Sequence, residues 1–115
     1  MIYKILTREQ WSSAQAAGTF TGSAVDVQDG FIHFSNATQV RETAAKHFAG
    51  QTDLLLLGIR EQALEQVMPG LLRWEPSRGG ALFPHLYGEL PAELVTWQAD
   101  LVWNGTEFEF PELPA

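Results

Sequence analysis

The chain contains no cysteine, and it is short of basic residues. Its 115 residues include seven Lys and Arg against fourteen Asp and Glu, which gives a formal net charge of −7. Without thiols the protein forms no disulfide bond and has no thiolate nucleophile, a composition compatible with the cytoplasm. The acidic excess argues against duplex nucleic acid as a partner, because affinity for a duplex depends on neutralising its phosphates.

The chain also lacks a long hydrophobic run. A membrane-spanning helix needs about 20 consecutive apolar residues, and the apolar start, Met1 to Leu6, is too short for a secretory signal and predicts a first strand. A chain of this length fits one compact domain that buries roughly two-thirds of its unfolded surface. We therefore expect one soluble cytoplasmic domain over residues 1–115, with no membrane partner. The sequence leaves the oligomeric state open.

Lys and Arg are absent after Arg78, and only acidic residues carry charge from there to the end. Residues 71–88 are the exception in this acidic half, because they hold Arg73 and Arg78 against one acid, Glu75. Two cationic side chains close in sequence can anchor an anion. We expect a small anionic ligand, such as a nucleotide, to find its anchors in this stretch.

Capping and periodicity signals predict alternating strands and helices before this stretch. Thr7 and Gln10 match a capping box for a helix ending near Gly18, and residues 18–30 are expected to form a loop. A second strand is predicted over 31–34, and Ser35 or Asn36 can cap the next helix, which ends near Gly50. The remaining expected elements are a strand buried on both faces (53–59), a short helix (61–67) and a strand (71–75).

The C-terminal part predicts an antiparallel hairpin. Trp97, Leu101 and Trp103 alternate with polar residues, and Asn104-Gly105 is a strong turn signal. Helices therefore lie early and strands late, which indicates an α+β class rather than a doubly wound parallel sheet. We expect two short, bent, mostly antiparallel sheets with two or three helices.

Two histidines lie inside apolar, strand-like segments, where an unpaired ring nitrogen would cost roughly 1–3 kcal/mol. In Phe-Ile-His33-Phe-Ser35 the residues His33 and Ser35 share a strand face, just before a helix whose N-terminal N–H groups favour anions. In Phe-Pro-His85-Leu-Tyr87-Gly, alternation places His85 and Tyr87 together, with Tyr87 able to stack on a base or nicotinamide ring. The alternative interpretations are structural. His33 would be a hydrogen-bonded core histidine and Ser35 a helix cap, and the segment with His85 would be a proline-rich corner with a buried Tyr87.

Between these segments lies Arg73-Trp-Glu75-Pro-Ser-Arg78-Gly-Gly. Arg73 and Glu75 share a strand face, so Arg73 either clamps a phosphate or carboxylate or pairs with an acid of the chain. Arg78 precedes two glycines that allow close backbone approach to a ligand. The third histidine, His47, falls near a helix end and has no short-range metal-ligand spacing to the others, so we expect no metal site.

These segments, taken in order with Asp29-Gly-Phe-Ile-His and Phe48-Ala-Gly followed by Asp53-Leu-Leu-Leu, resemble the bacterial family of domain of unknown function 952 over essentially the whole chain. The resemblance implies an ADP-ribosyltransferase-like fold, with a cleft for NAD between two bent sheets. It implies a ribose anchor at His33 and nicotinamide stacking on Tyr87. Glu75 is the first choice for the glutamate that faces the ribose, with Glu89, Glu107 and Glu109 as alternatives.

The same resemblance leaves the reaction open. Arg73, Arg78 and His85 are similar to the arginine and histidine sites of RNA 2′-phosphotransferases, which consume NAD within the same fold group. We therefore expect His33, Glu75 and His85 to be catalytic, and Ser35, Arg73, Arg78 and Tyr87 to bind NAD during ADP-ribosyl transfer or a related reaction. The alternative is a non-catalytic module that binds a nucleotide or another anionic metabolite, and whether this chain is an enzyme is left open.

Overall fold

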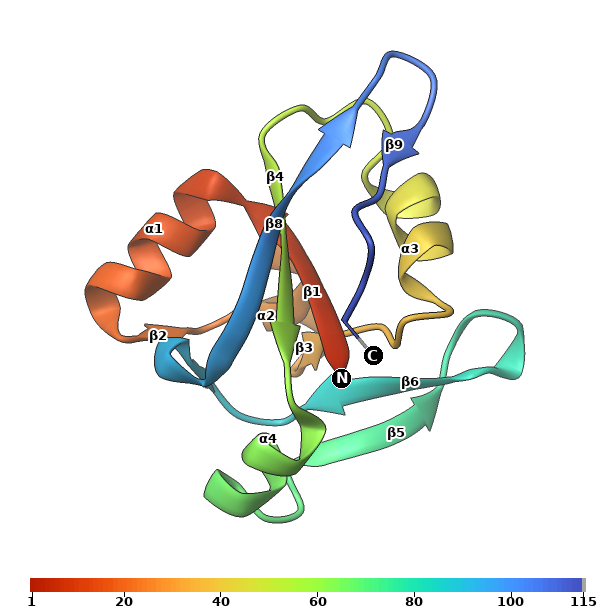
Figure 1. Cartoon of the computed structure of the whole chain (residues 1–115). Coiled ribbons are helices and arrows are strands. Elements are labelled where there is room, and N and C mark those ends of the chain that lie inside the picture. Colours follow the sequence, from red (N-terminus) through yellow and green to blue (C-terminus); the bar gives the residue numbers. More distant parts are fainter. Residues whose placement is uncertain (115) are drawn as a thin grey trace.

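The largest sheet has the predicted buried strand at its centre. The computed structural model describes residues 1–114, apart from the side chain of Arg78. Four antiparallel strands form the sheet in the order β1 (Ile2–Thr7), β4 (Leu54–Ile59), β8 (Val95–Trp103) and β9 (Phe108–Glu109) (Figure 1). Every residue of β4 is buried, because this strand is covered on both faces.

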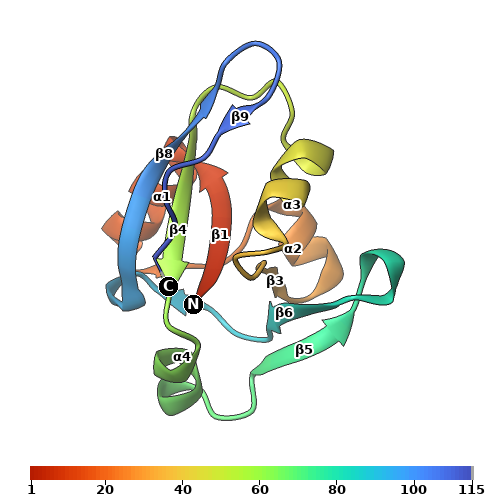
Figure 2. The same cartoon turned by 45° about the vertical axis from the view of Figure 1, so that its right-hand side comes forward.

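The alternating side chains of β4 enter two separate cores. Leu55, Leu57 and Ile59 join one core, which also receives Trp11 and Ala14 from α1 (Arg8–Ala17). Leu54 and Leu56 point into the other core, where they meet Val40 and Ala44 from α3 (Val40–His47). Helices α1 and α3 therefore lie on opposite sides of the sheet, as Figures 1 and 2 show.

A second sheet carries the candidate site. Its antiparallel strands follow the order β3 (Ile32–His33), β6 (Leu82–Leu86) and β5 (Leu72–Pro76), and it lies across the end of the large sheet near the N-terminus (Figures 1 and 2). Helix α4 (Glu61–Val67) precedes β5, and a 3₁₀ turn, η1 (Arg78–Gly80), joins β5 to β6. A small third sheet pairs β2 (Thr19–Phe20) with β7 (Leu90–Pro91), and a 3₁₀ turn, η2 (Ala92–Leu94), leads into β8.

The prediction of a loop over residues 18–30 is wrong in its second half. After β2 the chain forms α2 (Ala24–Asp29), which begins with a capping box between Ser23 and Asp26 and ends at Gly30 in the left-handed region. A helix of six residues is too short to be stable alone. It is held instead by the buried side chain of Asp26, which pairs with Lys4 of β1.

The α+β class is confirmed, but the details of its architecture differ from the prediction. Residues 1–114 contain four α-helices rather than two or three, and three separate sheets rather than two. All strand pairs in this part of the chain are antiparallel. None of the helices in the same residues has the length and apolar character to cross a membrane.

Several local predictions are confirmed at the level of side chains. Thr7 and Gln10 form the expected capping box, and α1 ends at Gly18 in the left-handed region. The C-terminal hairpin is present, with Trp103 paired to Phe108. Its loop spans four residues rather than two, because the side-chain oxygen of Asn104 accepts hydrogen bonds from the backbone N–H groups of residues 106 and 107.

The helix after β3 begins later than predicted. Neither Ser35 nor Asn36 caps it, since α3 starts at Val40 and its N-cap residue, Gln39, makes no side-chain capping bond. Asn36 instead stabilises the preceding turn, where its side-chain oxygen accepts from the backbone N–H groups of Thr38 and Gln39. The helix ends at His47, close to the end predicted near Gly50.

Candidate functional site

One face of the β3–β6–β5 sheet gathers most of the predicted site residues. In the register of this sheet, His33 on β3 is paired with His85 on β6, and His85 is paired with Arg73 on β5. Directly paired residues of neighbouring strands point to the same face. The sheet therefore aligns two imidazole rings and a guanidinium group in one row, although 52 positions separate the histidines.

Glu75 on β5 contacts His85 on β6 and Tyr87, which lies just after the end of β6. Its Oε1 atom accepts a hydrogen bond from the hydroxyl of Tyr87 at 2.6 Å and lies 2.9 Å from Nδ1 of His85. The Tyr87 hydrogen bond, and then the His85 hydrogen bond, lower the pKa of Glu75 below its usual value, and the nearby charge of Arg73 acts in the same direction. The bond to Glu75 correspondingly raises the pKa of Tyr87. Glu75 is therefore an ionised acceptor at neutral pH.

His33 is held by two carboxylates that sequence reasoning did not identify. Its Nδ1 atom lies 2.6 Å from Oδ1 of Asp26, and its Nε2 atom lies 2.9 Å from Oδ2 of Asp29. Only the imidazolium form can donate at both nitrogens, whereas a neutral ring donates at one. The two contacts fix the orientation of a side chain that is otherwise one-third exposed.

Asp26 is the buried carboxylate that holds His33 in place. Its carboxylate accepts from Nζ of Lys4 at 2.9 Å and from the backbone N–H groups of Ser23 and His33, besides contacting the His33 ring. Burial by itself would raise the pKa of Asp26, but the His33 hydrogen bond, the Lys4 charge and the Ser23 N–H together hold it well below its usual range. The side chains of Lys4 and Asp26 are 6% and 1% exposed, so this is a buried ion pair.

An aromatic side chain, Phe31, closes one side of the cluster. Its ring stacks on His85 with centroids 4.1 Å apart, and it also contacts His33 at 4.6 Å and Tyr87 at 5.2 Å. The guanidinium of Arg73 lies over the ring of Tyr87, with its central carbon 4.7 Å from the ring centroid. These contacts place aromatic faces, two imidazoles, a carboxylate and a cation within one small area.

Two of the predicted site residues are not part of this cluster. Ser35 is buried, forms a bridge with the backbone of Tyr3 and shares a hydrogen bond with the hydroxyl of Thr43. Strand β3 ends at His33, so the alternation that would have placed Ser35 beside it does not continue. The side chain of Arg78 lies outside the described part of the structure, and only its position in η1 is known.

The third histidine lies apart, and the donors do not form a metal cluster. His47 is exposed at the end of α3, which packs against the other sheet. Within the described residues, no group of three or more His, Asp or Glu side chains is arranged to hold a metal ion. The carboxylates beside His33 and His85 act instead as hydrogen-bond partners of the rings.

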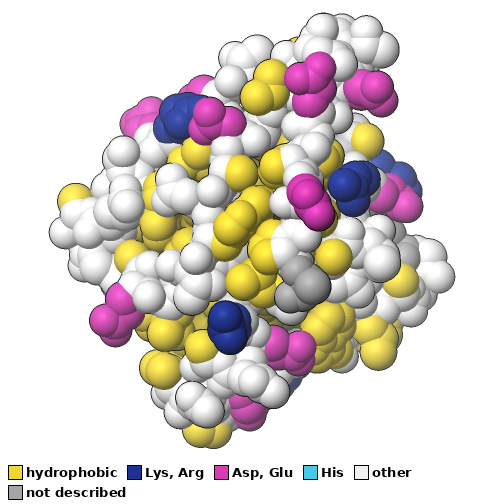
Figure 3. Space-filling model, in the orientation of Figure 1, with side chains coloured by type: hydrophobic (Ala, Val, Ile, Leu, Met, Phe, Trp, Pro, Cys, Tyr) yellow, Lys and Arg dark blue, Asp and Glu magenta, His cyan; other side chains and the backbone are white. Residues whose placement is uncertain are grey.

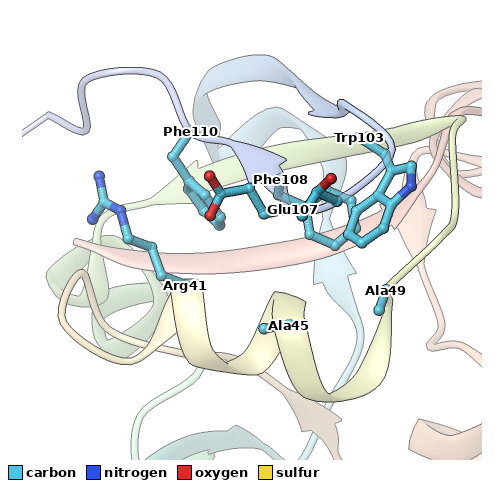
Figure 4. A pocket seen from close by; sticks show the side chains of 8 residues that line it. Arg41, Ala45, Ala49, Trp103, Glu107, Phe108 and Phe110 are labelled. Atoms are coloured by element: carbon cyan, nitrogen blue, oxygen red, sulfur yellow. The ribbon is translucent and has the colours of Figure 1, made fainter.

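Two hollows in the surface lie away from the histidines. One, of about 410 Å³, lies between α3 and the C-terminal hairpin, and Figure 4 shows Arg41 and Phe110 at one side of it and Trp103 at the other. The second, of about 490 Å³, lies beside α1 and β2. Neither contains a residue of the histidine cluster, and we place the candidate site by its side chains because two histidines, three carboxylates and Arg73 converge there.

The histidine cluster also lies off the face shown in Figure 3. Hydrophobic side chains gather across the middle of that face, over β4 and β8, with charged groups around them and no histidine visible. The polar cluster and the apolar surface are therefore separate features of the molecule.

Sequence reasoning missed Asp26, Asp29 and Phe31. For Asp26 a signal exists, because Ser23-x-x-Asp26 matches a capping box that starts a helix. Phe31 lies two residues before His33 and so shares its face by alternation. Asp29 lies four residues before His33, but only the turn at Gly30 brings its carboxylate back to the ring.

The sequence and the fold match a known family. The chain belongs to the family described as protein of unknown function (DUF952), whose model matches residues 5–98. It is similar to protein CC0527 from Caulobacter crescentus, with 50% sequence identity. The X-ray structure of CC0527 has a TM-score of 0.86, covering 93% of this chain and 90% of that one. Its solution NMR structure has a TM-score of 0.80, covering 93% and 89%. No curated protein matches the chain.

Proposed function

We propose that the β3–β6–β5 face binds a nucleotide, with NAD as the preferred ligand, and supports ADP-ribosyl transfer or a related NAD-consuming reaction. One observation carries the proposal. Glu75 on β5, His85 on β6 and Tyr87, which follows β6, are predicted from the sequence to serve this chemistry, and they meet at a single carboxylate oxygen. A carboxylate held ionised beside aromatic rings is the group that such a reaction requires.

The role proposed for Glu75 follows from the positive charge that develops on the ribose during the reaction. Departure of nicotinamide leaves positive charge on the ribose carbon, and a fixed carboxylate nearby stabilises that charge. The hydrogen bonds from Tyr87 and His85 lower the pKa of Glu75, which keeps the carboxylate charged at neutral pH. Arg73 is exposed next to Tyr87 and is available to a pyrophosphate oxygen. His33, one-third exposed, stands at the other end of the row, where a ribose hydroxyl would lie.

A non-catalytic role in binding NAD is the second candidate. It is favoured by the two donors on Oε1 of Glu75, because a carboxylate that orients a histidine and a tyrosine already has a structural use. In this case the face binds NAD without breaking the bond to nicotinamide.

Calorimetric titration with NAD and ADP-ribose, combined with chromatography for released nicotinamide, tests both candidates. The expected result is saturable binding that weakens by about ten- to hundredfold in Arg73→Ala, the scale of one charge-assisted hydrogen bond. Glu75→Gln should bind NAD but release no nicotinamide. Glu93→Gln, an exposed glutamate on η2, serves as the matched control and should behave as wild type.

The outcomes separate the two candidates. Binding with nicotinamide release that depends on Glu75 supports the enzyme, whereas binding without release supports the non-catalytic module. Wild-type protein that binds neither NAD nor ADP-ribose at millimolar concentration contradicts both.

A further inference from the structure

We propose that His33 and His85 also act as an acid–base pair that hydrolyses a phosphodiester bond in a nucleotide of the nucleoside 2′,3′-cyclic phosphate class. This inference rests on the proposed binding of nucleotides to the β3–β6–β5 face, but it does not require NAD to be the ligand. Here the two histidines act on a bond to phosphorus, whereas in the proposed NAD reaction the bond that breaks is at a ribose carbon.

The two histidines form matched pairs with carboxylates. Nδ1 of His33 lies 2.6 Å from Asp26, and Nδ1 of His85 lies 2.9 Å from Glu75. The two rings are cross-strand partners with centroids 5.5 Å apart. A carboxylate on Nδ1 fixes both the orientation of an imidazole and the proton on that nitrogen. In each pair the nitrogen left for chemistry is therefore Nε2.

The surroundings give the two rings different roles. In a neutral His85 ring whose Nδ1 donates to the Glu75 carboxylate, Nε2 carries the lone pair of a base. The His85 side chain is only 6% exposed, so a water molecule at Nε2 would be held largely apart from bulk solvent.

His33 is suited to the opposite role. Nε2 of His33 faces the carboxylate of Asp29 at 2.9 Å while Nδ1 faces Asp26, and an imidazolium satisfies both contacts as a donor. Asp29 is 42% exposed, so a substrate oxygen can take its place at Nε2 and receive the proton. Phe31 covers one face of the His85 ring and leaves the nitrogen edge as the direction of approach.

The proposed step balances with water as the only co-reactant. A water oxygen attacks phosphorus, and Nε2 of His85 takes one of its protons. The bond between phosphorus and the leaving ribose oxygen breaks, with its electron pair on oxygen, and Nε2 of His33 donates a proton to that oxygen. The products are a phosphomonoester and a free hydroxyl group. His85 then loses its proton to solvent and His33 regains one.

Arg73 supplies the anion-binding group that the proposed reaction also needs. It is paired with His85 in the sheet and is exposed, and its guanidinium can hold the phosphate oxygens that do not react. A fixed cation at this place stabilises the charge that develops on the phosphoryl oxygens as water adds. The row of His33, His85 and Arg73 thus offers an acid, a base and an anion-binding group on three adjacent strands.

Hydrolysis of adenosine 2′,3′-cyclic phosphate, followed by chromatography of the product monoester, tests this proposal. We expect turnover by the wild-type protein and a loss of about 10²- to 10⁴-fold in kcat for His33→Gln and for His85→Gln, the usual contribution of one general acid or base. Thermal unfolding is measured on each variant. His47→Gln, at the exposed third histidine, is the matched control and should keep wild-type kcat.

Two further variants keep the test decisive if His85→Gln fails to fold, since that side chain is buried. Glu75→Gln changes a partly exposed group and should lower kcat through loss of His85 orientation. His33→Ala, at a one-third exposed side chain, should recover activity when imidazole is added. No hydrolysis by wild-type protein above the buffer rate overturns the proposal. So does wild-type kcat in a folded His33→Gln protein, or a folded His33→Ala protein that imidazole does not rescue. Failure to bind NAD bears only on the earlier proposal.

Discussion

The hydroxyl group of Tyr87 lies 2.6 Å from Oε1 of Glu75, which is the same oxygen that faces Nδ1 of His85. One carboxylate thereby fixes an imidazole from the neighbouring strand and a phenol from the residue that follows that strand. The arrangement joins Glu75 of β5 to His85 of β6 on a face where the His85 side chain is itself buried and stacked against Phe31. Its hydrogen bonds therefore define the geometry of the candidate site directly.

Replacement of Tyr87 by Phe should raise the pKa of Glu75 towards its ordinary value, because the Tyr87 hydrogen bond is the largest cause of its depression. A depressed carboxyl pKa contributes stability above the unfolded-state pKa, and this contribution is lost as pH falls through the folded-state pKa. In Tyr87→Phe that loss should begin at a higher pH. Carbon-13 NMR titration of the Glu75 carboxylate measures the change directly.

Tyr3→Phe is the control for this prediction, because the hydroxyl of Tyr3 donates to the backbone oxygen of Pro114. It should leave the Glu75 titration as it is in wild type. An unchanged Glu75 pKa in Tyr87→Phe would show that the hydroxyl does not bond to the carboxylate in solution.

Replacement of Asp26 by Asn should destabilise the fold strongly. The variant leaves the buried ammonium of Lys4 without its counter-charge, and breaking a buried ion pair from one side costs about 3–5 kcal/mol. The depressed pKa of Asp26 adds a pH dependence, because its stabilising effect is complete above the unfolded-state pKa and is lost only in strong acid. Urea unfolding at several pH values should show this acid-limb loss in wild type and a smaller one in Asp26→Asn.

A double-mutant cycle with Lys4→Met identifies the source of that cost. Since both variants disrupt the same pair, the double variant should lose clearly less stability than the sum of the two single variants. Asp100→Asn breaks the exposed contact with Arg8 and should cost no more than about 1 kcal/mol. Additive losses for Lys4 and Asp26 would contradict the pairing.

The absence of a side chain at Gly22 leaves room for the side chain of Asp26. A methyl group at this position would lie 2.9 Å from Cβ of Asp26, on a backbone with φ of 111°. Gly22→Ala should therefore cost both the strain of a left-handed residue, about 1–2 kcal/mol, and a further ~1–3 kcal/mol for overpacking. Gly18→Ala is the matched control, since its φ is 86° and nothing lies within 4 Å. Equal free energies of unfolding for the two variants would show that the contact with Asp26 adds nothing to the cost of Gly22→Ala.

The parts of the fold that could be predicted are those with a local or periodic cause. Thr7 and Gln10 lie within one turn of each other and define the start of α1, and the run of leucines in β4 requires cover on both faces. The alternation of His85 with Tyr87 and of Arg73 with Glu75 likewise placed four side chains on the correct face. Each of these patterns depends on residues a few positions apart.

The parts that could not be predicted depend on distant partners. Helix α2 is too short to form from its own propensity, and it exists because Asp26 meets Lys4, 22 positions earlier in the chain. Ser35 was assigned to the site because the strand was expected to continue past His33, whereas the chain turns there to pair with Tyr3. Sequence alternation cannot show where a two-residue strand ends.

The most direct test of the account uses the fact that the chain has only three histidines. Their ring signals in a proton–carbon NMR correlation spectrum can be assigned by replacing each histidine in turn, and NAD can then be titrated into the wild-type protein. If the β3–β6–β5 face is the ligand site, the signals of His33 and His85 shift together along one saturable curve while that of His47 stays in place. Signals that do not move at millimolar NAD, or a shift confined to His47, would contradict the assignment of this face as the NAD site.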